Sequence, residues 1–321
     1  MKMKYIFSII IITALCLGKI NSQTSIPADL SLYDTQTFNK DYDALNSIES
    51  TQVINNGVTT TYTAGDEIVL KPGFHAKAGS EFTAKIEDVS NRITIMTTNL
   101  HRRKYAAQAE NILLMNPDVV AVQEIGYPRN NFNRMKEKTG YGGVHHATDP
   151  LNYIYGIGLL WKPSLGTVKI IPRSISTSSQ DEFFAGRAYI IAVFTDFCVV
   201  ATHYATTPRD RKKMTRAILN DTVVTMCKNF DKPVYIAGDL NDPLGEDGVK
   251  DLKDAGFEVL NDYSSSRDMI LEYNTNPDRA LINNDNDIAI PLPLITIDQW
   301  LDEANGGISD HLPRYVRVKF K

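Results

Sequence analysis

Hydrophobic positions follow two patterns along the chain, and the change falls near residue 90. Between about residues 50 and 86, short β-prone runs such as 59–62 and 68–70 are separated by turn residues. This pattern predicts a few short strands that stack through tight turns. From Arg92 onward, apolar runs of strand length alternate with stretches that carry apolar or small residues at helical spacing. Strands interleaved with helices predict an α/β layered domain whose sheets are covered by helices.

The same pattern places the elements of this second region. Strands are predicted at residues 93–100, 117–124, 156–161, 188–194, 198–203, 234–241, 295–301 and 314–320. Helices are predicted at residues 104–115, 209–229 and 249–255. The chain is long enough for one large core and a small additional module.

The first 22 residues have the pattern of a secretory signal peptide. Lys2 and Lys4 precede an uncharged stretch over residues 5–17, which small and polar residues follow. The apolar stretch is too short to span a bilayer comfortably, and no later stretch approaches the roughly 20 apolar residues of a membrane helix. We therefore expect an exported chain without a transmembrane segment. We also expect a monomer. The expected organisation is a signal peptide at 1–22, a linker at 23–49, a small β-module at 50–88 and a larger domain at 91–321.

Removal of the signal peptide would make the chain more acidic. It takes away three of the 34 basic side chains and none of the 38 acidic ones, so the formal net charge moves from −4 to −7. Net charge therefore does not favour tight, salt-driven binding to a polyanion, although a local basic patch remains compatible with it. Cys198 lies in a strand-like run and Cys227 in a helix-like one. We favour two separate buried thiols over a disulfide between them.

Polar residues end several of the apolar strands. The run at 234–238 ends on glycine and is followed by Asp239 and Asn241, which period-2 alternation points to the same side. Taken alone, this Asp-x-Asn sequence is explained equally well by an ordinary turn. Other strands end in the same way, on Asn99, Glu124 and His203, and Ser309, Asp310 and His311 precede the last one. Because unpaired polar groups are costly in a core, these strand ends predict one shared polar cleft at the sheet edge.

In this order the motifs resemble those of the endonuclease/exonuclease/phosphatase family. Its members are metal-dependent phosphoesterases that include deoxyribonucleases, bacterial sphingomyelinases and inositol-polyphosphate phosphatases. The resemblance covers roughly residues 92–321 and rests on Thr98-Asn99, Val122-Gln123-Glu124, Gly186-Arg187, Thr202-His203, Gly238-Asp239-Leu240-Asn241 and Ser309-Asp310-His311. It implies a four-layer α/β sandwich of two packed β-sheets flanked by helices.

The resemblance also implies a metal site, and the chemistry of the residues agrees. Glu124, helped by Asn99, can hold Mg²⁺, which prefers oxygen ligands and keeps waters. Mn²⁺ or Ca²⁺ would suit the same donors. Asp310 is a further candidate ligand, and Asp239 with Asp310 would position water or a second cation.

Two histidines and two nitrogen donors complete the expected site. His311 is the candidate general base for an attacking water, because its reference pKa lies near neutrality. His203 would contact the phosphate or protonate the leaving oxygen. Asn241 and Arg187 would hydrogen-bond the phosphoryl oxygens as charge builds on them.

The sequence departs from the family pattern at two places. The family has an aspartate that orients the last histidine, and we assign this role to Asp298, with Asp287 as the second choice. In the deoxyribonucleases an acid also supports the first histidine from the strand that corresponds to residues 153–161. This chain has Tyr153 and Tyr155 there and no acid, which leaves open what supports His203.

These features favour an exported Mg²⁺-dependent phosphoesterase that hydrolyses phosphodiester bonds, with a nuclease acting on nucleic acid as the leading hypothesis. A sphingomyelinase or a phosphatase of the same fold is the alternative within the family. A binding module that has lost activity is the alternative outside it.

Three further stretches receive less weight. Residues 64–82 resemble a coathanger-stack type of β-module found in exported proteins of the Bacteroidetes, which agrees with export and names no ligand. The basic run at 209–216 fits the solvated face of an amphipathic helix better than a nucleic-acid contact. His145 and His146 lie in a polar stretch without other metal ligands at suitable spacing, and we assign them no role.

Overall fold

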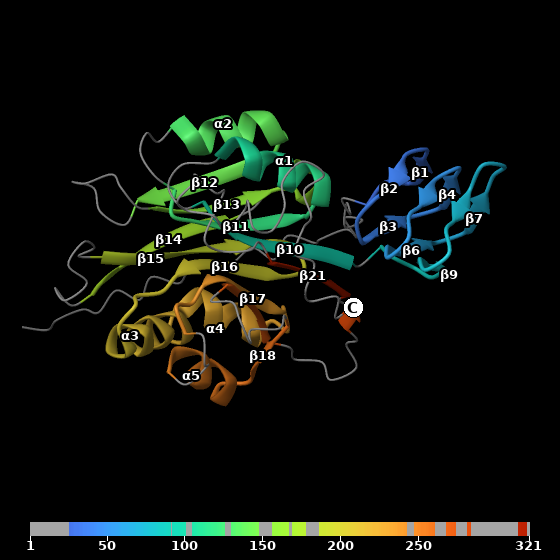
Figure 1. Cartoon of the computed structure of the whole chain (residues 1–321). Helices are drawn as coiled ribbons and strands as arrows, with labels where there is room; N and C mark the ends of the chain where they lie inside the picture. The colour runs from blue at the N-terminus through green and yellow to red at the C-terminus, as the bar shows by residue number, and fades with distance from the viewer. Residues whose placement is uncertain are drawn as a thin grey trace, which may run out of the picture.

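The computed structural model consists of a small β-module followed by a large α/β sandwich (Figure 1). It describes residues 26–90, 92–100, 105–125, 130–147, 156–166, 169–177, 186–242, 247–260, 268–273, 281–283 and 314–319. The expected signal peptide lies outside these residues. Among the described helices, none combines the length and the apolar character that crossing a membrane requires.

The β-module consists of three stacked coils, each made of three short strands. The strands are β1 (Asp29–Leu32), β2 (Thr35–Gln36), β3 (Lys40–Ala44), β4 (Ser47–Ser50), β5 (Val53–Ile54), β6 (Thr59–Ala64), β7 (Glu67–Leu70), β8 (His75–Ala76) and β9 (Glu81–Ile86). They pair in parallel as β1-β4-β7, β2-β5-β8 and β3-β6-β9. Ile48 and Tyr62 are fully buried in the module core. The coils approach so closely that a Cβ at Gly65 would lie 1.9 Å from the carbonyl oxygen of Leu45.

The first coil corrects the expected module boundary. The prediction of short stacked strands is confirmed, but the prediction of a linker over 23–49 is wrong from residue 29 on, because β1 to β3 form the first coil. Its strands are short and contain charged residues such as Lys40 and Asp41, so they show little hydrophobic contrast in the sequence. They gain their stability from pairing with the second coil.

The larger domain contains two mixed β-sheets packed face to face. The first has the order β12-β13-β11-β10-β21-β20, and the second has the order β14-β15-β16-β17-β19-β18. The strands of the first are β10 (Arg92–Asn99), β11 (Val119–Gln123), β12 (Gly142–Ala147), β13 (Gly156–Trp161), β20 (Leu281–Asn283) and β21 (Arg314–Lys319). Those of the second are β14 (Lys169–Ser176), β15 (Gly186–Val193), β16 (Cys198–His203), β17 (Val234–Asp239), β18 (Phe257–Val259) and β19 (Asp268–Tyr273). Buried apolar side chains from both sheets, among them Ile95, Leu159, Ile190 and Ala237, form the central core.

Helices cover the outer face of each sheet, which confirms the four-layer α/β sandwich. Helices α1 (Tyr105–Met115) and α2 (Asn130–Thr139) pack on the first sheet, and α3 (Pro208–Leu219), α4 (Thr222–Asn229) and α5 (Gly248–Asp254) pack on the second (Figure 1). A short 3-10 helix covers Pro163–Leu165. The single helix expected at 209–229 is wrong, because α3 ends at Leu219 and α4 begins at Thr222, with Asp221 between them. Its side chain accepts the N–H of Val223 and so caps α4.

The two cysteines form a disulfide, contrary to the expectation of separate thiols. Cys198 at the start of β16 is bonded to Cys227 in α4, with a Cα–Cα distance of 6.6 Å. Both residues are buried within the layer between the second sheet and its helices. The sequence showed the two elements but not that α4 packs directly over the start of β16, and this packing brings the sulfurs together.

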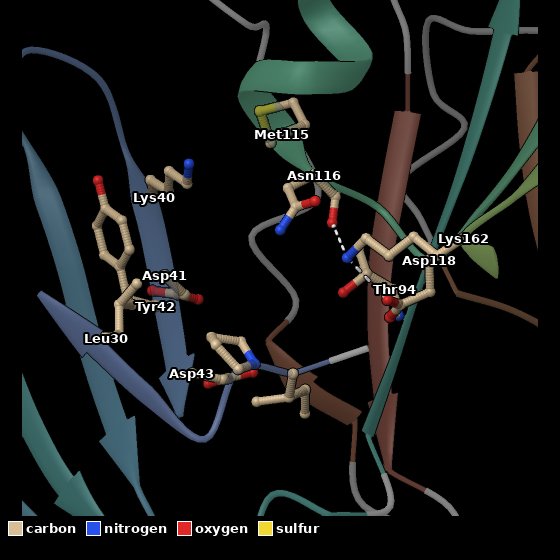
Figure 2. A pocket seen from close by; sticks show the side chains of 12 residues that line it. Leu30, Lys40, Asp41, Tyr42, Asp43, Thr94, Met115, Asn116, Asp118 and Lys162 are labelled. Carbon is tan, nitrogen blue, oxygen red and sulfur yellow. Dashed lines mark hydrogen bonds and ion pairs between the residues drawn. The ribbon is translucent and has the colours of Figure 1, made fainter. Parts of the chain in front are cut away.

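The module meets the sandwich at the start of β10, where buried charges join the two parts. Arg92 Nη1 lies 3.0 Å from Asp43 Oδ1, and the Arg92 and Asp43 side chains are only 2% and 8% exposed. Lys40 Nζ donates to the carbonyl oxygen of Leu114 near the end of α1, at 2.7 Å. A cavity of about 160 Å³ remains between the two parts. Figure 2 shows β3 side chains on one side of it, facing Met115 and Asn116 on the other.

Candidate functional site

The ends of four strands meet at one edge of the sandwich, as the sequence predicts. In the first sheet, β10 and β11 run parallel, with Asn99 beside Gln123. In the second, β16 and β17 run parallel, with His203 beside Asp239. The two pairs pack across the central core, since β10 contacts β17 and β11 contacts both β16 and β17. Figure 1 shows β10 starting beside the β-module and running away from it, so that the ends of these strands lie at the far edge.

Asn99 and Glu124 form the part of the site that the first sheet contributes. The Nδ2 atom of Asn99 donates to Glu124 Oε1 at 3.2 Å, and Asn99 is 1% exposed. Glu124 is half-buried and has a φ of 50°. Left-handed backbone costs a non-glycine residue roughly 1–2 kcal/mol. Such strain gathers at functional sites, where the surrounding structure enforces it.

His203 and Asp239 form a pair at the end of the second sheet. His203 Nε2 lies 3.4 Å from Asp239 Oδ2, and both side chains are less than a tenth exposed. On the other side of the ring, Arg187 Nη1 lies 3.5 Å from His203 Nδ1. Because a guanidinium can only donate, Nδ1 is the acceptor, and the proton of a neutral His203 sits on Nε2, facing Asp239. Asp239 of β17 therefore supplies the acid beside His203 that residues 153–161 lack.

The backbone after β17 turns sharply to bring Asn241 into the same site. Gly238 permits the close approach of β16, because a Cβ at this position would lie 1.9 Å from the carbonyl oxygen of Thr202. The N–H of Asn241 donates to Asp239 Oδ1 at 2.8 Å, and its Nδ2 donates to the carbonyl oxygen of Tyr204 at 2.8 Å. A primary amide has two N–H bonds. The bond to Tyr204 orients the group and leaves the second N–H as a donor for a ligand.

Asp268 belongs to the site and was not selected from the sequence. It is fully buried at the start of β19, directly opposite Asp239 in the antiparallel β17·β19 pairing. A charged residue that opens an apolar run, here Met269-Ile270-Leu271, is the signal that could have identified it.

Four of the residues proposed from sequence lie outside the described residues. These are Asp298, its alternative Asp287, and the pair Asp310 and His311. Their roles stay predictions. The structure brings together Asn99 with Glu124, and Arg187, His203, Asp239 and Asn241 with one another.

The described part of the site offers oxygen donors suited to a hard cation. The described residues contain no cluster of three or more His, Cys, Asp or Glu side chains placed to hold a metal ion. Glu124 and Asn99, which are in contact, supply one carboxylate and one amide. Mg²⁺ is commonly bound by one or two carboxylates while it keeps several waters. The donor chemistry of this pair therefore fits Mg²⁺.

Solved structures share this fold at low sequence identity. A mannosyl-6-phosphatase from Bacteroides thetaiotaomicron aligns with a TM-score of 0.52 and 15% identity over 71% of this chain and 100% of that chain. A conserved Enterococcus faecalis protein of unknown function aligns with a TM-score of 0.51 and 13% identity over 71% and 100%. The human Nocturnin catalytic domain aligns with a TM-score of 0.50 and 15% identity over 72% and 94%. At these identities the likeness shows the fold alone.

Sequence comparison gives the family. A search of curated protein sequences gave no match. The family model for the endonuclease/exonuclease/phosphatase family, in contrast, matches residues 96–311, which is well over half of the chain. The chain therefore belongs to the endonuclease/exonuclease/phosphatase family.

Proposed function

We propose that this chain is an exported, Mg²⁺-dependent phosphoesterase that hydrolyses phosphodiester bonds, with nucleic acid as its leading substrate. The observation that carries the proposal is the group formed by Arg187, His203, Asp239 and Asn241 at the same edge as the Asn99–Glu124 pair. Together these residues supply nitrogen donors from Arg187, His203 and Asn241 and carboxylate oxygens from Glu124 and Asp239. This combination suits a phosphoryl group, whose oxygens need both hydrogen-bond donors and a cation.

Each residue has a definite task in this proposal. Glu124 and Asn99 would hold Mg²⁺, which when bound neutralises charge on a phosphoryl oxygen. Asn241 donates its second amide N–H to another phosphoryl oxygen, and Arg187 adds a positive charge nearby. Asp239 keeps the proton of a neutral His203 on Nε2 and so orients the ring.

Water activation falls to the last histidine. His311 would take the proton of the attacking water, and His203 would contact the phosphate or protonate the leaving oxygen. Asp268 or Asp298 would orient His311. The burial of Asp268 beside Asp239 supports the first of these two.

The disulfide supports the proposed export. Disulfides persist in oxidising compartments and are rare in the cytosol, where thiols are kept reduced. The buried Cys198–Cys227 bond thus agrees with the secretory pattern of residues 1–22.

A substrate panel tests the function. The mature chain would be incubated with supercoiled plasmid, RNA, sphingomyelin and inositol phosphates, each with Mg²⁺ and with EDTA. We expect Mg²⁺-dependent cleavage of nucleic acid, loss of that cleavage in Glu124→Gln, and full activity in the control Glu137→Gln, which alters an exposed acid of α2. Turnover of only the lipid or the small esters would move the chain to another branch of the family. Inactivity on all four would favour the binding-module alternative.

A further inference from the structure

Arg211 is a basic residue of α3 that does not behave as the solvated charge expected from the sequence. Its side chain is 12% exposed, whereas Arg209 and Arg216 on the same helix are exposed. The expectation of a solvated basic face is therefore wrong at this position. A guanidinium is placed in a largely buried position when it has hydrogen-bond partners that compensate for lost water.

Those partners come from three separate segments beside the site. Arg211 Nη1 donates to the carbonyl oxygen of Thr206, after β16, at 2.6 Å and to that of Asn241, after β17, at 2.8 Å. Arg211 Nη2 donates to Asp247 Oδ2 at 2.6 Å. This last contact holds the pKa of Asp247 below its usual range. One planar side chain thus ties together the loops that follow His203 and Asp239 and the residue before α5.

Asn241 is the residue that most depends on this arrangement. Its φ is 48°, which is left-handed backbone that a non-glycine residue adopts only when its surroundings enforce it. Its N–H is bonded to Asp239, its side-chain amide to Tyr204 and its carbonyl oxygen to Arg211. The first two bonds hold the backbone N–H and the side chain of Asn241. The bond to Arg211 holds the peptide group between Asn241 and Asp242.

The segment beyond Asn241 is fixed in the same way. Asp242 Oδ2 accepts the N–H groups of Asp247 and Val249, at 3.1 Å and 3.0 Å. Thr215, one turn after Arg211 on α3, donates to the carbonyl oxygen of Gly248 at 3.1 Å. One face of α3 therefore holds both ends of the connection between β17 and α5.

We propose that Arg211 is a positioning residue for the site, which acts by holding the backbone of Asn241 so that its free amide N–H points at the substrate. The inference rests on the proposed function for its catalytic consequence. The arginine acts through the Asn241 carbonyl and makes no contact with the reacting atoms. Lysine cannot replace it, because a single ammonium on a flexible stem lacks the planar fork that spans the three partners.

Kinetics with matched variants test the catalytic consequence. Arg211→Ala should lower kcat about 10- to 100-fold with KM changed less than threefold, because a misplaced donor costs transition-state stabilisation on this scale. Guanidinium ion at millimolar concentration should restore part of the rate in Arg211→Ala and none in wild type. Arg211→Lys should stay impaired, and the control Arg209→Ala should keep wild-type kcat. Equal kcat in wild type and Arg211→Ala would overturn the proposal.

Hydrogen exchange separates this inference from the proposed function. In Arg211→Ala, amides at 239–242 should exchange at least tenfold faster than in wild type, while those of β10 should not change. If the wild type hydrolyses no phosphoester, the proposed function fails, and the exchange result still decides whether Arg211 holds Asn241. If Arg211→Ala does not fold, the same comparison is made with Arg211→Lys. Unchanged exchange at 239–242 in the folded variant would overturn the inference.

Discussion

Strands β10, β11 and β16 each have polar or sulfur-containing residues at their starts and at their ends. The contacts of these residues at the strand starts differ from those at the strand ends. At the starts, Arg92 meets Asp43, Asp118 meets Lys162, and Cys198 is bonded to Cys227. At the ends stand Asn99, Glu124 and His203. The contacts at the starts are ion pairs or a covalent bond. Those at the ends are longer polar contacts of 3.2 to 3.5 Å.

The difference separates two uses of polar groups in one fold. A buried ion pair with short contacts compensates for desolvation and joins elements of structure. Long or poorly aligned hydrogen bonds are common among catalytic groups before a ligand is bound. We therefore expect changes at the strand starts to lower stability and spare activity, and changes at the strand ends to do the reverse.

The largest effect is expected at the end of the second sheet. His203→Ala and Asp239→Asn should each lower kcat/KM about 1,000-fold. The double variant should be little worse than either one, because the two groups act as a unit. Steady-state kinetics on the substrate identified by the panel would measure this. Fully additive losses would contradict a shared role for the pair.

At the start of β16, removal of the disulfide should change stability instead. Cys198→Ala with Cys227→Ala opens a bond with a sequence separation of 29 residues, which should cost about 3 to 4 kcal/mol in the free energy of unfolding. Urea unfolding of this variant and of the wild type would give the difference. The kcat of folded protein should stay within twofold. A large loss of kcat without loss of stability would break the comparison.

The start of β10 should behave similarly but more weakly. Asp43→Ala leaves Arg92 with Glu87 as its remaining carboxylate partner, at 3.0 Å. The expected cost is about 2 to 3 kcal/mol, since a buried charge loses one of its two partners. Glu49→Gln is the matched control in the exposed Lys71–Glu49 pair of the same module, and it should cost less than about 0.5 kcal/mol. Equal effects of the two variants would mean that the module is not anchored by Arg92.

The smallest effect concerns His146, the second-last residue of β12, which pairs with Ile157 of β13. Its Nε2 is 2.9 Å from Ser174 Oγ of β14, and burial lowers its pKa below the ordinary value. Below about pH 6.5 the unfolded chain therefore binds a proton that the folded chain does not, so stability falls as the pH falls through this range. His146→Asn should flatten the dependence of the urea midpoint on pH between 7 and 5. An unchanged pH dependence would show that other groups cause it.

The sequence predicted the sandwich well because its central strands are long and apolar. The strands expected at 93–100, 198–203 and 234–241 match β10, β16 and β17 to within two residues. Asn99, Glu124, His203 and Asp239 could be selected because each stands where an apolar run ends. Short strands with polar faces, such as β1 and β3, carry too little contrast for this kind of analysis.

The features that could not be predicted from the sequence depend on which elements pack together. The disulfide follows from the position of α4 over β16, and the role of Arg211 follows from the loops that meet beside α3. Asp268 was not selected because its strand lies between polar segments. Its pairing partner Asp239 in β17 is 29 residues earlier in the chain. Spacing along the chain does not reveal such contacts, since they are set by the way the layers assemble.

One paired measurement on β11 tests the central claim most directly, because this strand has an acid just before its start and another just after its end. Asp118→Asn breaks the ion pair with Lys162, and Glu124→Gln removes the proposed metal-binding charge. Both kcat and the free energy of unfolding would be measured for each variant. We expect Asp118→Asn to lose about 1 to 3 kcal/mol of stability with kcat within twofold of wild type. Glu124→Gln should keep its stability within about 0.5 kcal/mol and lose at least 100-fold in kcat. Retained activity in Glu124→Gln, or a loss of activity in Asp118→Asn as large as that in Glu124→Gln, would contradict the account.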